Sequence, residues 1–132
     1  MLTVTKRFEF EAAHNLPKHP GKCKQLHGHS YQLEVEIGIW NQGRILDDVD
    51  PDTGMIMDFG DLKQIVQETI IERMDHHNLN AVLAITPTAE LMVMWIRAAL
   101  DQVLTSRGMT DLYLARVRLW ETSNSYAEWK LR

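Results

Sequence analysis

The chain has 132 residues, of which 45% are hydrophobic, and this size and composition predict a single domain, residues 1–132, with one core. A net charge of −4 and a pI of about 5.8 disfavour nucleic acid as a partner, because such binding needs a basic face. One cysteine excludes an internal disulfide and suits a reducing cytoplasm. We expect no membrane association, because there is no signal-peptide-like start and no run of roughly 18 apolar residues.

Residues 2–14 alternate between apolar and polar side chains, which is the period of a strand with one buried face. The apolar face is interrupted only by Lys6 and ends at His14; its other members are Leu2, Val4, Phe8, Phe10 and Ala12. A histidine in this place is either a hydrogen-bonded core residue or a ligand at the end of the core.

Residues 15–26 are predicted to form a loop, because they contain Pro17, Pro20 and Gly21. Four potential cations fall within seven residues of this loop: Lys18, His19, Lys22 and Lys24. They form either a solvated loop or an anion site suited to a phosphorylated ligand.

A second alternating segment follows, in which one face is formed by His29, Tyr31, Leu33, Val35, Ile37 and Ile39. His27 and His29 are two residues apart, so an extended chain points both imidazoles to the same side. Antiparallel pairing with residues 2–14 would bring His14 to them. Three histidines leave one position of a zinc ion open, as in catalytic sites, whereas adding Cys23 would close the shell. Because a closed shell leaves the other polar motifs without a task, we expect a Zn²⁺ site of three histidines.

Residues 41–54 are rich in turn formers and acids. They resemble the start of a calcium-binding loop, but Thr53 stands where glycine is needed and Phe59 where glutamate is needed. We expect a turn at residues 50–54 and a short strand at residues 55–57. Asp58 is then predicted to cap a helix that ends near Met74.

The helix is followed by Asp75-His76-His77-Asn78-Leu79-Asn80. This segment is either a polar helix end or an acid–base pair in which Asp75 fixes the tautomer of His76. Neighbouring residues in a helix do not face one another, so a direct Asp75–His76 pair requires a non-helical bend.

A second helix is predicted from Thr86, as its cap, to Arg107-Gly108. Capping alone explains Thr88 in its first turn. A strand at residues 111–122 carries Glu121 on the face formed by Tyr113, Ala115, Val117 and Leu119, and a further strand returns over residues 125–131. A carboxylate in an apolar row is costly to bury alone, so Glu121 lies beyond the core or accepts hydrogen bonds.

Five motifs occur in order between Phe10 and Ser125: FEAAHNL, CKQLHGHSY, MDHHNLN, PTAE and WETSNS. Together they resemble the 6-pyruvoyltetrahydropterin synthase superfamily. Only three residues separate Cys23 from His27, which resembles the 6-carboxytetrahydropterin synthase branch, since the pyruvoyl-forming branch has a longer gap. The stretch from Trp40 to Asp52 departs from the family because it is longer than the usual connection.

The resemblance implies an α+β T-fold (tunnelling fold). Its elements follow one another along the chain as β-β-α-α-β-β, and its antiparallel sheet has two helices on one face. It implies a homo-oligomeric barrel, trimer-based and hexameric, with active sites between subunits. The implied reaction converts 7,8-dihydroneopterin triphosphate to 6-carboxytetrahydropterin, with loss of acetaldehyde and triphosphate, in queuosine biosynthesis.

The resemblance also assigns roles to side chains. Zn²⁺ is held by His14, His27 and His29, and Cys23, Asp75 and His76 transfer protons. Glu121 anchors the pterin, Thr88 contacts substrate, and Lys22 and Lys24 suit its phosphates. A 6-pyruvoyltetrahydropterin synthase and a non-catalytic zinc-binding assembly module remain as alternatives.

Overall fold

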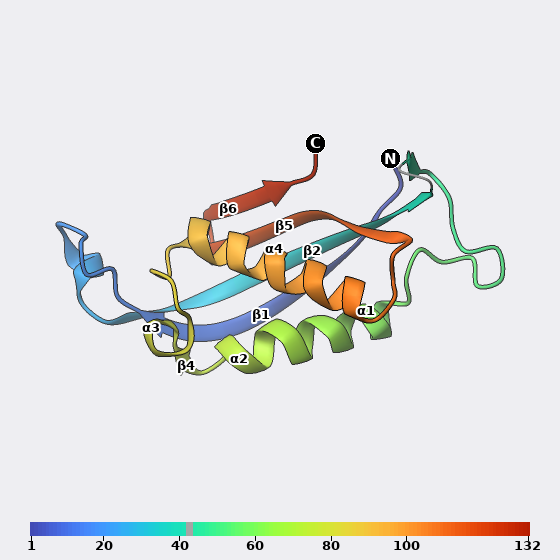
Figure 1. The fold of residues 1–132 in the computed structure, drawn as a ribbon. Coiled ribbons are helices and arrows are strands. Elements are labelled where there is room, and N and C mark those ends of the chain that lie inside the picture. Colours follow the sequence, from blue (N-terminus) through green and yellow to red (C-terminus); the bar gives the residue numbers. More distant parts are fainter. Residues whose placement is uncertain (42–43) are drawn as a thin grey trace.

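A computed structural model describes residues 1–41 and 44–132 (Figure 1). Its centre is a sheet with the strand order β4-β1-β2-β5-β6, and β3 pairs with β2 beside this path. The strands are β1 (Val4–His14), β2 (His27–Asn41), β3 (Arg44–Leu46), β4 (His77–Asn78), β5 (Leu112–Thr122) and β6 (Ser125–Lys130). All pairings are antiparallel except that of β4 with β1. The expected antiparallel sheet is therefore confirmed, with β3 and the short parallel β4 as additions.

The helices lie on one face of this sheet, as expected (Figure 1). One helical segment consists of α1 (Phe59–Val66), a π-helical turn (Gln67–Ile71) and α2 (Glu72–Met74); the other long helix is α4 (Ala89–Ser106). A short α3 (Leu79–Val82) and a 3-10 turn (Lys22–Lys24) complete the described elements. None of the described helices is long and apolar enough to cross a membrane.

The alternating patterns of β1 and β2 are confirmed. The two strands pair from Val4 opposite Ile37 to His14 opposite His27, and Phe10 stacks on Tyr31 with ring centroids 4.9 Å apart. The inward side chains of both strands pack against the helices. This register places the histidines directly after the core rows.

The prediction of a strand at residues 55–57 is wrong, because Ile56 and Met57 form a bend and Met55 belongs to no strand. Ile56 and Met57 are buried in the core, so their apolar character reflects packing rather than strand pairing. The turn at residues 50–54 is confirmed by Asp50, whose carboxylate accepts the N–H groups of Asp52 and Thr53 at 2.8 and 3.0 Å. Residues 42 and 43 of the longer connection lie outside the described residues.

The predicted start of the second helix is also wrong. Thr88, rather than Thr86, is the N-cap: its hydroxyl oxygen accepts the N–H of Leu91 at 3.2 Å, and its backbone is extended. Pro87 therefore lies before the helix, and its carbonyl is free to accept a hydrogen bond from a side chain.

Two irregularities change the predicted faces of β5. Glu36 pairs with Arg116 but Ile37 pairs with Leu114, so β5 contains one extra residue relative to β2 at this point. Tyr113 is thereby turned to the side opposite Val117, against Gly38, and its predicted place in the core row is wrong. A second register shift falls between Trp120 and Thr122 and leaves Glu121 without a partner in β6.

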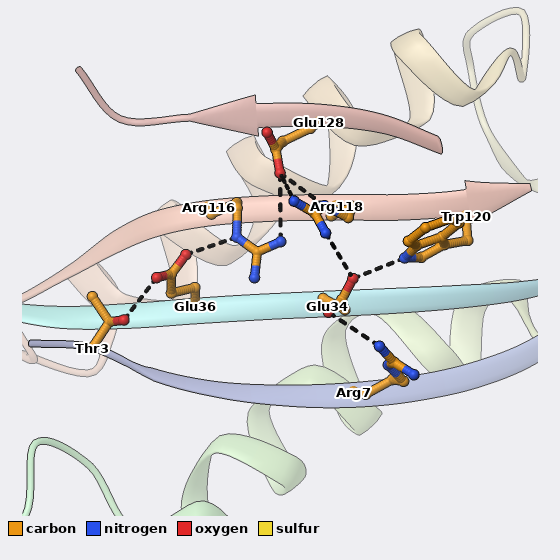
Figure 2. A network of polar contacts seen from close by, with 8 residues as sticks. All are labelled: Thr3, Arg7, Glu34, Glu36, Arg116, Arg118, Trp120 and Glu128. Atoms are coloured by element: carbon orange, nitrogen blue, oxygen red, sulfur yellow. Dashed lines mark hydrogen bonds and ion pairs between the residues drawn. The ribbon is translucent and has the colours of Figure 1, made fainter. Parts of the chain in front are cut away.

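The sheet face away from the helices carries a network of ion pairs and hydrogen bonds (Figure 2). Glu34, which is only 8% exposed, accepts the indole N–H of Trp120 at 2.8 Å and lies 3.4 Å from Arg7. Arg116 and Arg118 carry the network on to Glu36 and Glu128, at 2.7 and 2.8 Å. These contacts tie β1, β2, β5 and β6 together through charge-assisted bonds.

Candidate metal centre

Three histidines converge where β1 ends and β2 begins. One ring nitrogen from each of His14, His27 and His29 lies within 4.8 Å of the others. The three rings meet edge to face, with centroids 4.6 to 5.0 Å apart. His14 is fully buried, whereas His27 is half-buried and the His29 side chain is 20% exposed, so the cluster is partly open to solvent through these two rings.

Backbone carbonyls determine which nitrogens are available. The Nδ1–H of His14 donates to the Pro87 carbonyl at 2.7 Å, and that of His27 donates to the Gln25 carbonyl at 2.7 Å. Both neutral rings then present a bare Nε2, and these two atoms are 3.0 Å apart. Two acceptors cannot hydrogen-bond to each other, whereas a shared cation satisfies both.

The donor set fits zinc. Zn–N distances of 2.0–2.1 Å in a tetrahedral site put neighbouring nitrogens about 3.3 Å apart, close to the spacing of the His14 and His27 Nε2 atoms. Burial lowers the pKa of His29, and its two histidine neighbours lower it further against the opposing effect of Glu121. The neutral imidazole is the form that binds a metal.

Glu121 is part of the same cluster. Its Oε1 lies 3.4 Å from Nε2 of His14 and 3.7 Å from Nε2 of His29. The carboxylate also lines a cavity of about 560 Å³ between the first turn of α4 and β6. Its side chain is 28% exposed, so it is shielded only in part.

Asp75 and His76 form the predicted direct pair, and the required bend is present. His76 has a φ of 59°, and its Nδ1 lies 2.9 Å from the Asp75 carboxylate. The N–H of Glu11 also donates to this carboxylate at 2.9 Å, and this bond is the main reason that the pKa of Asp75 lies below its usual value. His76 itself is 79% exposed and borders a hollow of about 470 Å³ that it shares with Glu11 and His29.

Residues 15–26, which contain Cys23 and the lysines, extend past the end of the sheet (Figure 1). Lys22 and Lys24 are exposed and Cys23 is half-buried. The Cys23 carbonyl accepts the N–H of Leu16 at 2.7 Å. Among the described residues, its thiol does not join the group of converging metal donors. Thr88 caps α4, as the simpler interpretation of that residue has it.

Three groups at the centre were not anticipated from the sequence: the Tyr31 hydroxyl and the carbonyls of Pro87 and Gln25. Tyr31 is fully buried, and its hydroxyl lies 3.4 Å from Nδ1 of His14. Burial, with a further effect of Glu121, raises the pKa of Tyr31 above its ordinary value, so the hydroxyl stays neutral. The sequence could have indicated Tyr31, because it lies on the same strand face as His29. The positions of the Pro87 and Gln25 carbonyls have no signature in the sequence.

An α+β fold with its helices on one face of the sheet, and with three histidines at the sheet's end that could hold a metal ion, defines a protein of the T-fold class. The family model described as 6-pyruvoyl tetrahydropterin synthase matches residues 3–131. The chain belongs to that family.

Relatives with two different names are similar to the chain. A 6-carboxy-5,6,7,8-tetrahydropterin synthase from Synechocystis sp. is 37% identical over 130 residues, covering 98% of this chain and 93% of the relative. A 6-pyruvoyl tetrahydrobiopterin synthase from Pongo abelii is 30% identical over 141 residues, covering 96% and 90%. The structure of Caenorhabditis elegans 6-pyruvoyl tetrahydropterin synthase has the same fold, with a TM-score of 0.79 at 24% identity over 99% of this chain and 96% of that one.

Proposed function

We propose that the protein is a zinc-dependent 6-carboxy-5,6,7,8-tetrahydropterin synthase, a lyase of queuosine and 7-deazaguanine biosynthesis. It would convert 7,8-dihydroneopterin triphosphate and water to 6-carboxytetrahydropterin, acetaldehyde and triphosphate. The observation that carries the proposal is the three-histidine centre with Glu121 beside it, at 3.4 Å from His14.

His14, His27 and His29 would hold the metal. Bound Zn²⁺ would supply Lewis acidity toward the oxygens of the substrate side chain. Burial of His14 and the carbonyls that hold two of the rings support this role, because they orient the ligand nitrogens.

Protons would be moved by Cys23 and His76. Cys23 would remove a carbon-bound proton as thiolate, the reactive form of the cysteine side chain. Asp75 would hold the tautomer of His76, and their 2.9 Å contact supports this. The high exposure of His76 leaves its ring free to meet a substrate.

The substrate would be bound at both of its ends. Glu121 would accept two adjacent N–H groups of the pterin, which match one carboxylate. Its position between the histidines and the 560 Å³ cavity supports this role. Lys22 and Lys24 would face the triphosphate, and Thr88 would contact substrate in addition to capping α4.

The protein would act in the cytoplasm as a homo-oligomer, a trimer-based hexamer with its sites between subunits. Open edges support this assembly: β6 ends the described sheet on one side, and on the other β4 pairs with only Ala12 and Ala13 of β1. Cys23 lies on the extended loop and His76 on the bend after α2, and a site between subunits would allow two chains to supply them.

A 6-pyruvoyltetrahydropterin synthase is the second candidate, supported by the relative that is 30% identical. The short Cys23–His27 gap and the higher identity of 37% favour the carboxy product. A non-catalytic zinc-binding module is disfavoured, because a metal with only a structural role needs neither the Asp75–His76 pair nor Glu121.

The deciding experiment is incubation of the zinc-loaded protein with 7,8-dihydroneopterin triphosphate, followed by mass analysis of the products. The proposal requires 6-carboxytetrahydropterin and acetaldehyde. The pyruvoyl product would establish the second candidate, and unchanged substrate would favour the assembly module.

A further inference from the structure

Residues 75–80 run beside residues 11–15, which are the end of β1 and the residue after it and lead into the metal centre. The middle of this contact is the parallel pairing of β4 with β1: Ala12 with His77 and Ala13 with Asn78. At its start the N–H of His76 donates to the Glu11 carbonyl at 2.6 Å, while the Asp75 carboxylate accepts the Glu11 N–H. A side chain thus takes the place of a peptide group and lengthens a two-residue ladder.

Asn80 does the same at the other end. Its Oδ1 accepts the N–H of Asn15 at 2.8 Å, and its Nδ2 donates to the Asn15 carbonyl at 2.9 Å. One carboxamide therefore satisfies both peptide groups of the residue directly after the ligand His14. These partners also fix the orientation of the amide, since the reversed amide would oppose donor to donor.

Asn15 is the root of the loop that carries Cys23. The next residue, Leu16, donates its N–H to the Cys23 carbonyl at 2.7 Å, and the Asn15 side chain donates to the Lys24 carbonyl at 3.4 Å. Hydrogen bonds thus lead from Asn80 through residues 15 and 16 to Cys23. Asn80 is itself held in place, because its own N–H donates to the Asn78 side chain at 3.1 Å.

We propose that Asn80 is a positioning residue, which fixes the point where the chain leaves the metal centre and so holds the Cys23 loop in place. The metal ligands depend less on this carboxamide. His14 is also held by its pairing with His27 and by the Pro87 carbonyl. Loss of Asn80 should therefore loosen the loop and leave the three-histidine site intact.

Amide hydrogen exchange, read over peptides within residues 11–26, tests this directly. In the wild-type protein the Asn15 and Leu16 amides should be protected. Asn80→Ala should speed their exchange roughly tenfold, the effect of losing about one hydrogen bond. Asn80→Asp should do the same, because it keeps the acceptor for the N–H but sets a second acceptor against the carbonyl.

Asn124→Ala is the matched control, since it removes an asparagine whose contacts are confined to the β5–β6 turn. It should leave exchange in residues 11–26 unchanged. The inference is overturned if the wild-type Asn15 and Leu16 amides exchange like an open loop, a result that needs no variant. It is also overturned if Asn80→Ala changes nothing or speeds exchange equally in α4 and β5.

Two further measurements separate positioning from general support. Zinc content should remain at the wild-type value in Asn80→Ala; loss of zinc would contradict the inference. A second measurement rests on the proposed function: with 7,8-dihydroneopterin triphosphate, kcat should fall roughly tenfold, with KM changed less than about twofold, because misplaced reacting groups slow chemistry more than binding. A comparable rise in KM with kcat unchanged would contradict it. If the wild-type protein shows no turnover, the proposed function fails, while the exchange data still decide the role of Asn80.

Discussion

His14 and His27 lie opposite one another at the ends of β1 and β2, with their Nε2 atoms 3.0 Å apart. Each ring donates its other nitrogen's hydrogen to a backbone carbonyl, so two lone pairs face each other. Without a cation or an added proton this contact is unfavourable. The strand pairing and the two carbonyls hold the rings in this arrangement, so the fold itself prepares a place where a cation could bind.

Replacing His29 with alanine should empty the site. We expect about one zinc per chain in the wild-type protein and much less in His29→Ala, because two histidines do not complete a zinc site. Elemental analysis of dialysed protein measures this. His77→Ala is the matched control: His77 lies outside the cluster and its ring contacts the Asp75 carbonyl. Full zinc in His29→Ala would remove this residue from the ligand set.

The regular parts of this fold were predictable because they repeat a simple period. β1 and β2 alternate over their length, with Lys6 the one interruption in β1, and this period with antiparallel pairing brought His14 to His27 and His29. The bulge in β5 was not predictable, because residues 113–119 continue to alternate while the pairing slips. Gly38 was the only sign, since a glycine within a strand often marks a close approach. An added Cβ there would lie 2.4 Å from the Tyr113 ring.

The side chains of the candidate site could be predicted from the sequence, but the backbone groups that contribute to it could not. Thr86 and Thr88 are equally good caps by type, so only the hydrogen bond to Leu91 distinguishes them. The position of the cap decides whether the Pro87 carbonyl can accept a hydrogen bond from Nδ1 of His14. Similarly, β4 is two residues long, too short for any period, and its role depends on Asp75 and Asn80.

Neutralising Lys22 and Lys24 should weaken phosphate recognition. Both side chains are exposed on the extended loop, so their replacement by glutamine should leave the fold unchanged. We expect affinity for dihydroneopterin triphosphate to fall far more than affinity for the dephosphorylated analogue, because only the former carries the opposing charge. Calorimetry with both ligands measures this difference. Lys63→Gln, on the exposed side of α1, is the control, and equal losses for both ligands would show that the loop lysines do not bind phosphate.

The network in Figure 2 should make stability depend on pH through Glu34. Burial opposes ionisation of this carboxyl, but hydrogen bonds from Trp120 and Arg7, together with the charges of Arg116 and Arg7, outweigh it and hold its pKa below the usual 4.5. A lowered folded-state pKa means that the unfolded chain binds the proton first. The stabilisation is therefore complete above pH 4.5 and is lost as pH falls through the folded-state pKa.

Glu34→Gln should lower the free energy of unfolding at pH 7 by about 1–3 kcal/mol, the usual cost of weakening hydrogen bonds to a buried charge. The difference from wild type should shrink below pH 4.5. Urea unfolding between pH 3 and 7 measures both effects. Glu9→Gln removes an exposed carboxylate of β1 and should follow the wild-type curve. A difference for Glu34→Gln that stays constant with pH would show that its charge is not the stabilising feature.

Glu121→Gln distinguishes a pterin anchor from a metal ligand. Its carboxylate lies 3.4 Å from Nε2 of His14 and also lines the neighbouring cavity, so both roles are within reach. The amide keeps one acceptor but places an N–H₂ group against a ring donor. Losing a hydrogen bond to a charged group costs about 1.5–3 kcal/mol, so pterin affinity should fall by roughly one to two decades. Zinc content should not change, because three histidines suffice.

Calorimetry and elemental analysis on one preparation measure both quantities, with Glu128→Gln as a control from the same cavity. Unchanged pterin affinity would exclude Glu121 as the anchor, whereas loss of zinc would make it a ligand or a direct support of the metal.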